Sequence, residues 1–188
     1  MKKVLLGLGM LCGTFAMAQK FGVKAGGNLA SISEDDTKSK FGFYAGAYMN
    51  APLTAKLSIQ PEVLYSLQGA KADYSGIDAK LNTGYINVPV MLQYALAEGF
   101  SVEAGPQFGF LTSAKMKATV SGQSGEVDVK DDMNSFDFGI GVGAAYNITP
   151  KLNINARYVA GITDMVKDNP GSAVRNNVFQ FGLGYTFN

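Results

Sequence analysis

Five charged side chains stand inside segments whose other residues alternate between apolar and small polar types. They are two cations and three carboxylates: Lys24, Glu62, Glu103, Asp137 and Arg157. Charges in a low-dielectric interior must be paired or hydrated, because an isolated buried charge is very costly. The pattern favours a polar network that fills an interior. A second interpretation is a path for ions or protons along Arg157 and its carboxylate partner.

The residue types also restrict catalysis. The chain has no histidine, which excludes serine–histidine and aspartate–histidine mechanisms, and nothing in the sequence places two carboxylates at an accessible site. Residues 139–144 match G-x-G-x-x-A, but the same alternation runs on through Tyr146, whereas a nucleotide site needs a helix there. We therefore predict no catalytic residue, no cofactor and no enzymatic activity.

The elements that must position the five charges are segments with a two-residue period. In the last of them, Phe179, Phe181, Leu183 and Tyr185 share one parity, while glycine and polar residues occupy the other. A period of two indicates extended strands, because successive side chains point to opposite faces. Eight such strands are predicted, over residues 21–32, 41–50, 57–69, 85–96, 100–111, 136–146, 152–162 and 176–188.

The distribution of charge favours a membrane barrel over a soluble one. Charged residues make up 16% of the chain, against about 25% in soluble domains, and all five in-strand charges lie on the non-aromatic parity. A lipid-facing surface excludes charge, since an arginine or lysine at mid-bilayer costs about 2–4 kcal/mol. A soluble lipid carrier would instead carry charge on its outside.

The connections between the strands alternate in length. Short turns at residues 51–56, 97–99 and 147–151 alternate with long polar loops at 33–40, 70–84, 112–135 and 163–175, as in outer-membrane barrels. We predict an all-β, eight-stranded antiparallel up-and-down transmembrane β-barrel, closed by pairing of its first and last strands. With an even number of strands, both termini face the periplasm and the long loops face outward.

The amino terminus has the features of a signal peptide. Met1-Lys2-Lys3 precedes an apolar run and the A-x-A sequence Ala16-Met17-Ala18, so residues 1–18 are predicted to be cleaved and residues 19–188 to form the barrel domain. The mature chain would carry 16 − 2 = 14 basic and 15 acidic residues. This balance gives no reason to expect nucleic acid binding.

The longest loop, 112–135, itself alternates. Val120 and Val127 lie on its two apolar limbs, and Gly122 to Gly125 form the predicted turn of an extracellular hairpin. Unpaired strand edges there could bind a partner by β-augmentation, and the alternative is an ordinary solvated hairpin. The acidic residues of this loop lack a recognised calcium-ligand spacing, and no metal site is predicted from them: Glu126, Asp128, Asp131 and Asp132.

Three prolines, Pro61, Pro89 and Pro106, fall inside predicted strands and could mark bulges or strand ends. They also belong to three sequence blocks, Gln60-Pro61-Glu62-Val63-Leu64-Tyr65-Ser66, Tyr85-Ile86-Asn87-Val88-Pro89 and Ala104-Gly105-Pro106-Gln107-Phe108-Gly109-Phe110-Leu111. In order, these blocks resemble the PorT-like outer-membrane β-barrel family of the Bacteroidota, often labelled as porin family proteins. The resemblance covers essentially the whole mature chain and implies an outer-membrane barrel.

These observations lead to one expected function and one alternative. The expected function is non-enzymatic, a structural or surface-interaction role carried by the extracellular loops of a barrel in the outer membrane of a Gram-negative cell. The alternative is a small passive channel through the polar interior, although eight strands leave an interior just filled by side chains. The expected partners are outer-membrane lipid, the barrel-assembly machinery during insertion, and a surface protein or ligand at the long loops.

Overall fold

The computed structural model describes residues 19–34, 37–74, 77–120 and 123–187. The predicted signal peptide, residues 1–18, and Gly122 lie outside these ranges. Within them the chain forms β-strands and one 3-10 helix, η1. The elements are β1 (Lys20–Ile32), β2 (Thr37–Pro52), β3 (Leu57–Tyr74), β4 (Ile77–Ala97), β5 (Phe100–Val120), β6 (Gln123–Asp128), η1 (Lys130–Asp132), β7 (Phe136–Asn147), β8 (Leu152–Gly161) and β9 (Asn176–Thr186).

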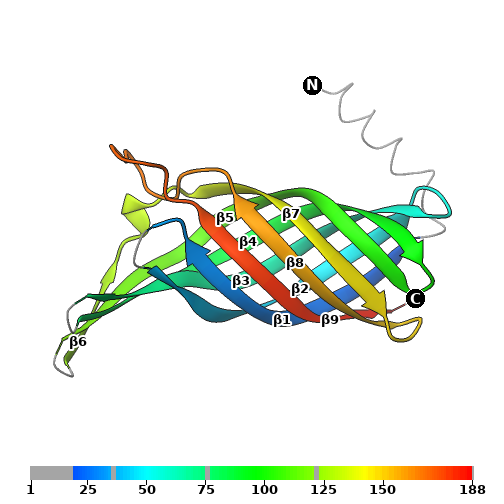
Figure 1. Ribbon diagram of the computed structural model, residues 1–188, viewed down its shortest axis with the longest axis horizontal. Helices are drawn as coiled ribbons and strands as arrows, with labels where there is room; N and C mark the ends of the chain where they lie inside the picture. The colour runs from blue at the N-terminus through cyan, green and yellow to red at the C-terminus, as the bar shows by residue number, and fades with distance from the viewer. Residues whose placement is uncertain (1–18, 35–36, 75–76, 121–122, 188) are drawn as a thin grey trace.

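Eight of these strands close into an antiparallel ring (Figure 1). The ring is closed by β1 and β9, which pair from Gly22 with Thr186 to Ile32 with Asn176. Within the part of the chain that the structure describes, β6 pairs with β5 alone and stands outside the ring. This arrangement confirms the predicted eight-stranded barrel. In the described ranges no helix is long and apolar enough to cross a membrane.

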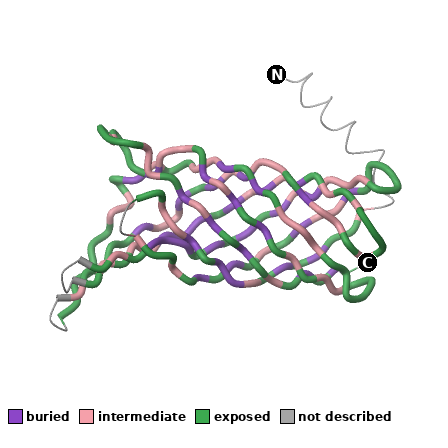
Figure 2. The backbone as a smooth tube through the Cα atoms, in the orientation of Figure 1, coloured by how far each residue is buried: buried purple, intermediate pink, exposed green. Residues whose placement is uncertain are grey.

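The two faces of the ring differ as the alternation predicts. Large apolar side chains point outward, so that Phe43 is 61% exposed and Val63 57%. The alternate positions point inward, where Tyr85 is 1% and Arg157 3% exposed. Along each strand of Figure 2, buried and exposed residues accordingly alternate around the barrel wall. The interior is thus filled with side chains, most of them polar.

Four strands extend beyond their predicted ends and correct the loop assignment. β2 begins at Thr37, β3 continues to Tyr74, β4 begins at Ile77 and β5 continues to Val120. Much of the predicted loops 33–40, 70–84 and 112–135 is therefore strand, and this extended sheet projects from one end of the barrel (Figure 1). These segments were predicted to be loops because they carry charged residues. A paired strand outside a bilayer, however, tolerates charge on its solvated faces.

The three prolines mark neither strand ends nor register shifts. Pro61 is the cross-strand partner of Val90, Pro89 of Gln107, and Pro106 of Ile140, all inside continuous strands. Beside Pro61 and Pro89 the registered pairing with the next strand is interrupted for two residues. A residue without an N–H is accommodated where the ladder is already interrupted.

Candidate functional site

Four of the five predicted interior charges meet inside the barrel. Lys24 of β1 and Arg157 of β8 both bind Glu62 of β3: Lys24 Nζ lies 2.8 Å from Oε1, and Arg157 forms two bonds of 2.8 and 3.0 Å with the carboxylate. Arg157 Nε also donates to Glu103 Oε1 of β5 at 2.6 Å. A planar guanidinium suits this double role, because its donors lie in a fixed fork.

These four residues, hereafter the ion-pair layer, are neutral as a set and almost fully buried. Two cations face two carboxylates, and each of the four side chains is at most 4% exposed. Neighbouring amides complete the bonding: Gln60 Nε2 donates to Glu62 and Gln93 Nε2 to Glu103, at 2.8 and 2.9 Å. Buried charges are stable only when paired and hydrogen-bonded in this way.

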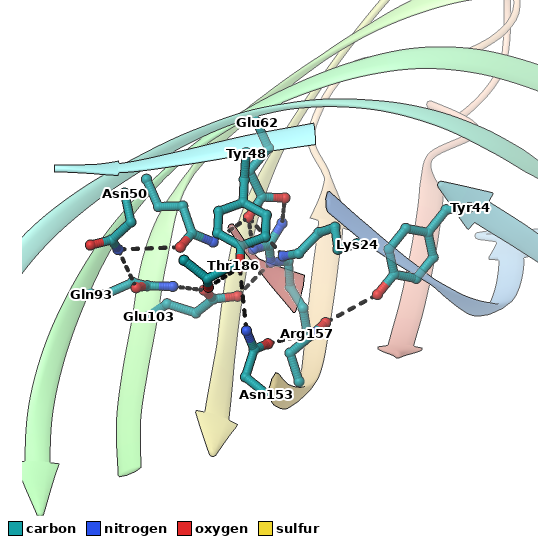
Figure 3. A network of polar contacts seen from close by, with 12 residues as sticks. Lys24, Tyr44, Tyr48, Asn50, Glu62, Gln93, Glu103, Asn153, Arg157 and Thr186 are labelled. Carbon is teal, nitrogen blue, oxygen red and sulfur yellow. Dashed lines mark hydrogen bonds and ion pairs between the residues drawn. The ribbon is translucent and has the colours of Figure 1, made fainter. Parts of the chain in front are cut away.

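Two tyrosines extend the network around the wall (Figure 3). The hydroxyl groups of Tyr48 and Thr186 share a bond of 2.7 Å, and the ammonium of Lys24 lies 5.8 Å from the centre of the Tyr48 ring. Tyr44 donates to Asn155 Oδ1 at 3.0 Å. The contacts link β1, β2, β8 and β9, the strands on both sides of the β1–β9 seam. The network therefore cross-links the barrel where its first and last strands pair.

A polar cavity of ≈ 200 Å³ adjoins the ion-pair layer at the end of the barrel with short connections. Asn147 at the end of β7 and Pro150 of the following short connection line it, as do the inward-facing Asn50 and Gln93. Lys24 and Glu103 also line this cavity, so the ion-pair layer borders it from inside. Water or a small ion fits this cavity, but the ion-paired side chains fill the lumen beyond it.

Asp137 does not join the ion-pair layer. Among the described residues its carboxylate accepts bonds from Thr163 Oγ1 at 2.8 Å and Asn176 Nδ2 at 3.4 Å. Asn176 also donates to Gln68, which belongs to a separate group of buried amides with Ser66. The parity of Asp137 predicts its inward orientation, but not its position along the barrel axis.

An apolar cluster closes the end of the barrel that carries the long connections. Tyr85, Leu111 and Ala114 contribute inward-facing side chains from β4 and β5, and Met133 and Met165 cover them from two different loops. The two loops are joined by backbone bonds, including Asn134 N to Met165 O at 2.8 Å. This cap was not predicted from the sequence, and the signal for it was the presence of methionine in two otherwise polar loops, 112–135 and 163–175.

Asp164 organises the loop between β8 and β9. Its Oδ1 accepts the backbone N–H groups of Val166 and Val174 at 3.0 and 3.2 Å, and Asn169 Nδ2 donates to Oδ2 at 2.9 Å. These bonds lower the pKa of the Asp164 carboxyl, and the bond from the Val166 N–H has the largest effect. The ionised carboxylate therefore holds in place the loop that carries Met165.

We expect the order of this loop to depend on pH through Asp164. A carboxyl with a depressed folded pKa adds stability above its unfolded pKa of about 3.9, and that stability is lost as the pH falls through the folded pKa. Amide exchange should show Val166 and Val174 protected at pH 5 and progressively exposed below about pH 4.

Asp164→Asn should lower the protection at pH 5 and abolish its pH dependence, because an amide does not titrate. Asp168→Asn, in the same loop and exposed, is the matched control and should behave as the wild type. Equal protection in the wild type from pH 3 to 7 would contradict this role of Asp164.

The two limbs of the predicted hairpin are β5 and β6, and three residues of the predicted turn belong to β6. Val120 pairs with Gln123 and Ala118 with Gly125, so residues 123–125 of the predicted turn are strand, while Gly122 lies outside the described residues. Gly122 and Gly125 indicated the turn, but Gly125 lies within β6, where a Cβ atom would meet nothing within 4 Å and neither a turn nor a close approach requires glycine. Val127 pairs with Met116 and is 65% exposed.

The acidic residues of the hairpin pair with neighbours. Glu126 accepts a bond from Lys115 Nζ at 2.8 Å, and Asp128 Oδ1 accepts the N–H of Lys130 at 2.9 Å. Within the described ranges, no group of three or more histidine, cysteine, aspartate or glutamate side chains is arranged to hold a metal ion.

Comparison with known proteins places this geometry in a family. A family model described as "Outer membrane protein beta-barrel domain" matches residues 14–167. Among curated protein sequences, none matches the chain.

Solved structures with a similar fold share little sequence with this chain. The crystal structure of Ail, the attachment invasion locus protein of Yersinia pestis, is 18% identical with a TM-score of 0.55, over 91% of this chain and 100% of that one. Neisserial surface protein A is 17% identical with a TM-score of 0.55, over 89% and 97%. CarO of Acinetobacter baumannii is 11% identical with a TM-score of 0.51, over 88% and 97%. At these identities the similarity establishes the fold alone.

Proposed function

The chain belongs to the outer membrane protein β-barrel domain family, and on this premise we propose that it is a closed, non-enzymatic barrel that binds a surface partner through its long-loop end. We propose that this end faces outward from the cell, with residues 1–18 cleaved as a signal peptide and residues 19–188 forming the barrel. The three proline-containing sequence blocks support a finer assignment to the PorT-like barrels of the Bacteroidota.

The observation that carries this proposal is the free edge of β6. Among the described residues the strand pairs only with β5, and it is exposed along its whole length. The bond from Val129 N to Ala114 O continues the β5–β6 ladder, so odd-numbered residues of β6 bind β5. In an antiparallel pair the alternate residues direct their N–H and C=O groups away from the partner. Ser124 and Glu126 therefore offer unpaired backbone groups to an added strand.

An apolar surface beside this edge supports specific binding. Val127 and the 46% exposed Met116 lie on one face of the hairpin. This face leads to an apolar recess of ≈ 430 Å³ that is lined by Val129, Met133 and Met165, among others. An extended peptide on the edge of β6 could direct alternate side chains toward this recess, which would add specificity to backbone bonding.

The interior supports a structural rather than a catalytic role. Both buried carboxylates of the ion-pair layer bind Arg157, and histidine is absent from the sequence. The polar cavity beside this layer is the observation that favours the alternative function, a small passive channel. Conductance distinguishes the two functions, because a channel must open this layer and the apolar cap.

We expect Ser124→Pro to abolish partner binding, because proline removes an outward N–H and places its ring at the edge of β6. Proline is tolerated on edge strands with that geometry, so the barrel should still fold. The assay is adhesion of barrel-displaying cells to a panel of immobilised extracellular proteins. Deletion of residues 113–133 should abolish the same binding, and Ser124→Ala, which keeps the N–H, should retain it.

Two outcomes would contradict the proposed edge function. In the first, cells displaying the wild-type barrel bind no better than cells without it. In the second, deletion of residues 113–133 leaves binding unchanged. Electrophoretic mobility of unheated samples verifies that each variant is folded.

A further inference from the structure

Four lysines form a row across the outer face of the projecting sheet. Lys38 of β2 lies opposite Lys71 of β3. Lys71 in turn lies opposite Lys80 of β4, and Lys80 lies opposite Lys117 of β5. Neighbouring strands are about 4.8 Å apart, so the row is about 14 Å long. Like charges directly opposite one another destabilise a sheet. The row thus carries a cost that an external anion would remove.

The nearby carboxylates form their ion pairs with other lysines and leave three lysines of the row without one among the described residues. Asp73 binds Lys38 at 2.5 Å, and Glu126, the cross-strand partner of Lys117, binds Lys115 instead at 2.8 Å. Asp73 and Asp78 face each other two residues further toward the tip of the sheet, on the same face as Lys71 and Lys80. The other three lysines of the row are exposed and form no ion pair with any described residue: Lys71, Lys80 and Lys117.

The row lies beyond the exposed apolar residues of the outer barrel wall, on the face of the sheet that continues this wall. Along β3 the outward-facing Leu67 is four residues before Lys71, about 13 Å at the rise of a strand. On β4, Ile86 has the same parity as Lys80 and is 41% exposed. The lysines therefore stand on the face that continues the lipid-facing wall, beyond its last large apolar residues, on the side from which a lipid headgroup would approach.

We propose that Lys71, Lys80 and Lys117 bind the phosphate groups of phosphorylated outer-leaflet lipids. A phosphate monoester carries about −1.5 to −2 charge at pH 7, so two phosphates offset the positive charge of the three lysines. The ammonium groups are compact point charges on flexible stems, which suits a headgroup that approaches from the side. This inference rests on the outward orientation proposed above, and it assigns the site to lipid rather than to the partner of β6.

The test is native mass spectrometry of the refolded barrel in an uncharged detergent, titrated with diphosphorylated lipid A. We expect saturable binding that Lys71→Gln/Lys80→Gln/Lys117→Gln weakens at least about tenfold. The arginine triple variant at the same positions should retain binding. A control triple variant, Lys56→Gln/Lys130→Gln/Lys151→Gln, removes the same charge elsewhere and should leave binding unchanged.

Two further titrations in the same experiment identify the ligand. Dephosphorylated lipid should not bind, and millimolar inorganic phosphate should not displace the lipid. Displacement by inorganic phosphate would overturn the lipid assignment, and equal affinity of the row and control variants would overturn the site. Ser124→Pro leaves the row intact, so it should bind lipid normally while losing partner adhesion. The two proposals therefore fail separately.

Discussion

Replacing Arg157 with alanine is expected to destabilise the folded barrel by about 3–5 kcal/mol, the cost of leaving buried charges without their partner. Arg157 is the only residue that contacts both carboxylates of the ion-pair layer among the described residues. Without it, Glu62 keeps Lys24 as its one cation, while Glu103 keeps only the amide bond from Gln93. The loss exceeds that of any exposed salt bridge, which contributes about 0–1 kcal/mol.

The measurement is urea unfolding in lipid vesicles, followed by electrophoretic mobility because the chain has no tryptophan. Arg175→Ala is the matched control, since Arg175 is exposed and, among the described residues, its side chain donates only to the carbonyl of Ile162. A quadruple variant that replaces the whole layer, Lys24→Met/Glu62→Gln/Glu103→Gln/Arg157→Met, should recover much of the loss. If Arg157→Ala unfolded at the same urea concentration as Arg175→Ala, the layer would not stabilise the barrel.

Valine at Gly26 is expected to destabilise the barrel by about 3 kcal/mol or more, at the upper end of overpacking effects. Gly26 faces Gly182 across the β1–β9 seam. A Cβ atom at Gly26 would meet the carbonyl oxygen of Phe181 and lie 2.6 Å from the Cα atom of Gly182. These are backbone atoms, so they cannot move aside as a flexible side chain could.

Gly125→Val is the control for this substitution. Both glycines lie in strands, where valine is intrinsically favoured, but a Cβ atom at Gly125 would meet nothing within 4 Å. Gly26→Val should lose the mobility shift of the folded barrel at lower urea or fail to refold, while Gly125→Val should match the wild type. Equal stability of the two variants would show that the seam tolerates a side chain.

The alternation of side chains predicted most of the ring, because a wall between lipid and a filled lumen imposes opposite requirements on successive residues. Phe179 and Gln180 differ in polarity for this reason, and so do Leu183 and Gly184. Parity also identifies Lys24, Glu62, Glu103 and Arg157 as inward-facing. It cannot state which of them meet, since that depends on the stagger between strands far apart in sequence.

Three features could not be obtained from the pattern alone. Lys71 and Lys80 made paired strands look like loops, because charge is excluded from a strand only where lipid surrounds it. Asp137 has the inward parity but lies with Asn176, away from the other charges. Met133 and Met165 meet only because the loops fold over the barrel end, and no local rule predicts such a contact.

The closed interior is the central claim, and single-channel conductance of the refolded barrel in a planar bilayer tests it most directly. The ion-pair layer and the apolar cap close the lumen in series. A membrane that contains verified, folded wild-type barrel should therefore stay silent at moderate voltages. Stable, reproducible openings whose conductance changes in Arg157→Ala would contradict the claim and make the interior network a path for ions.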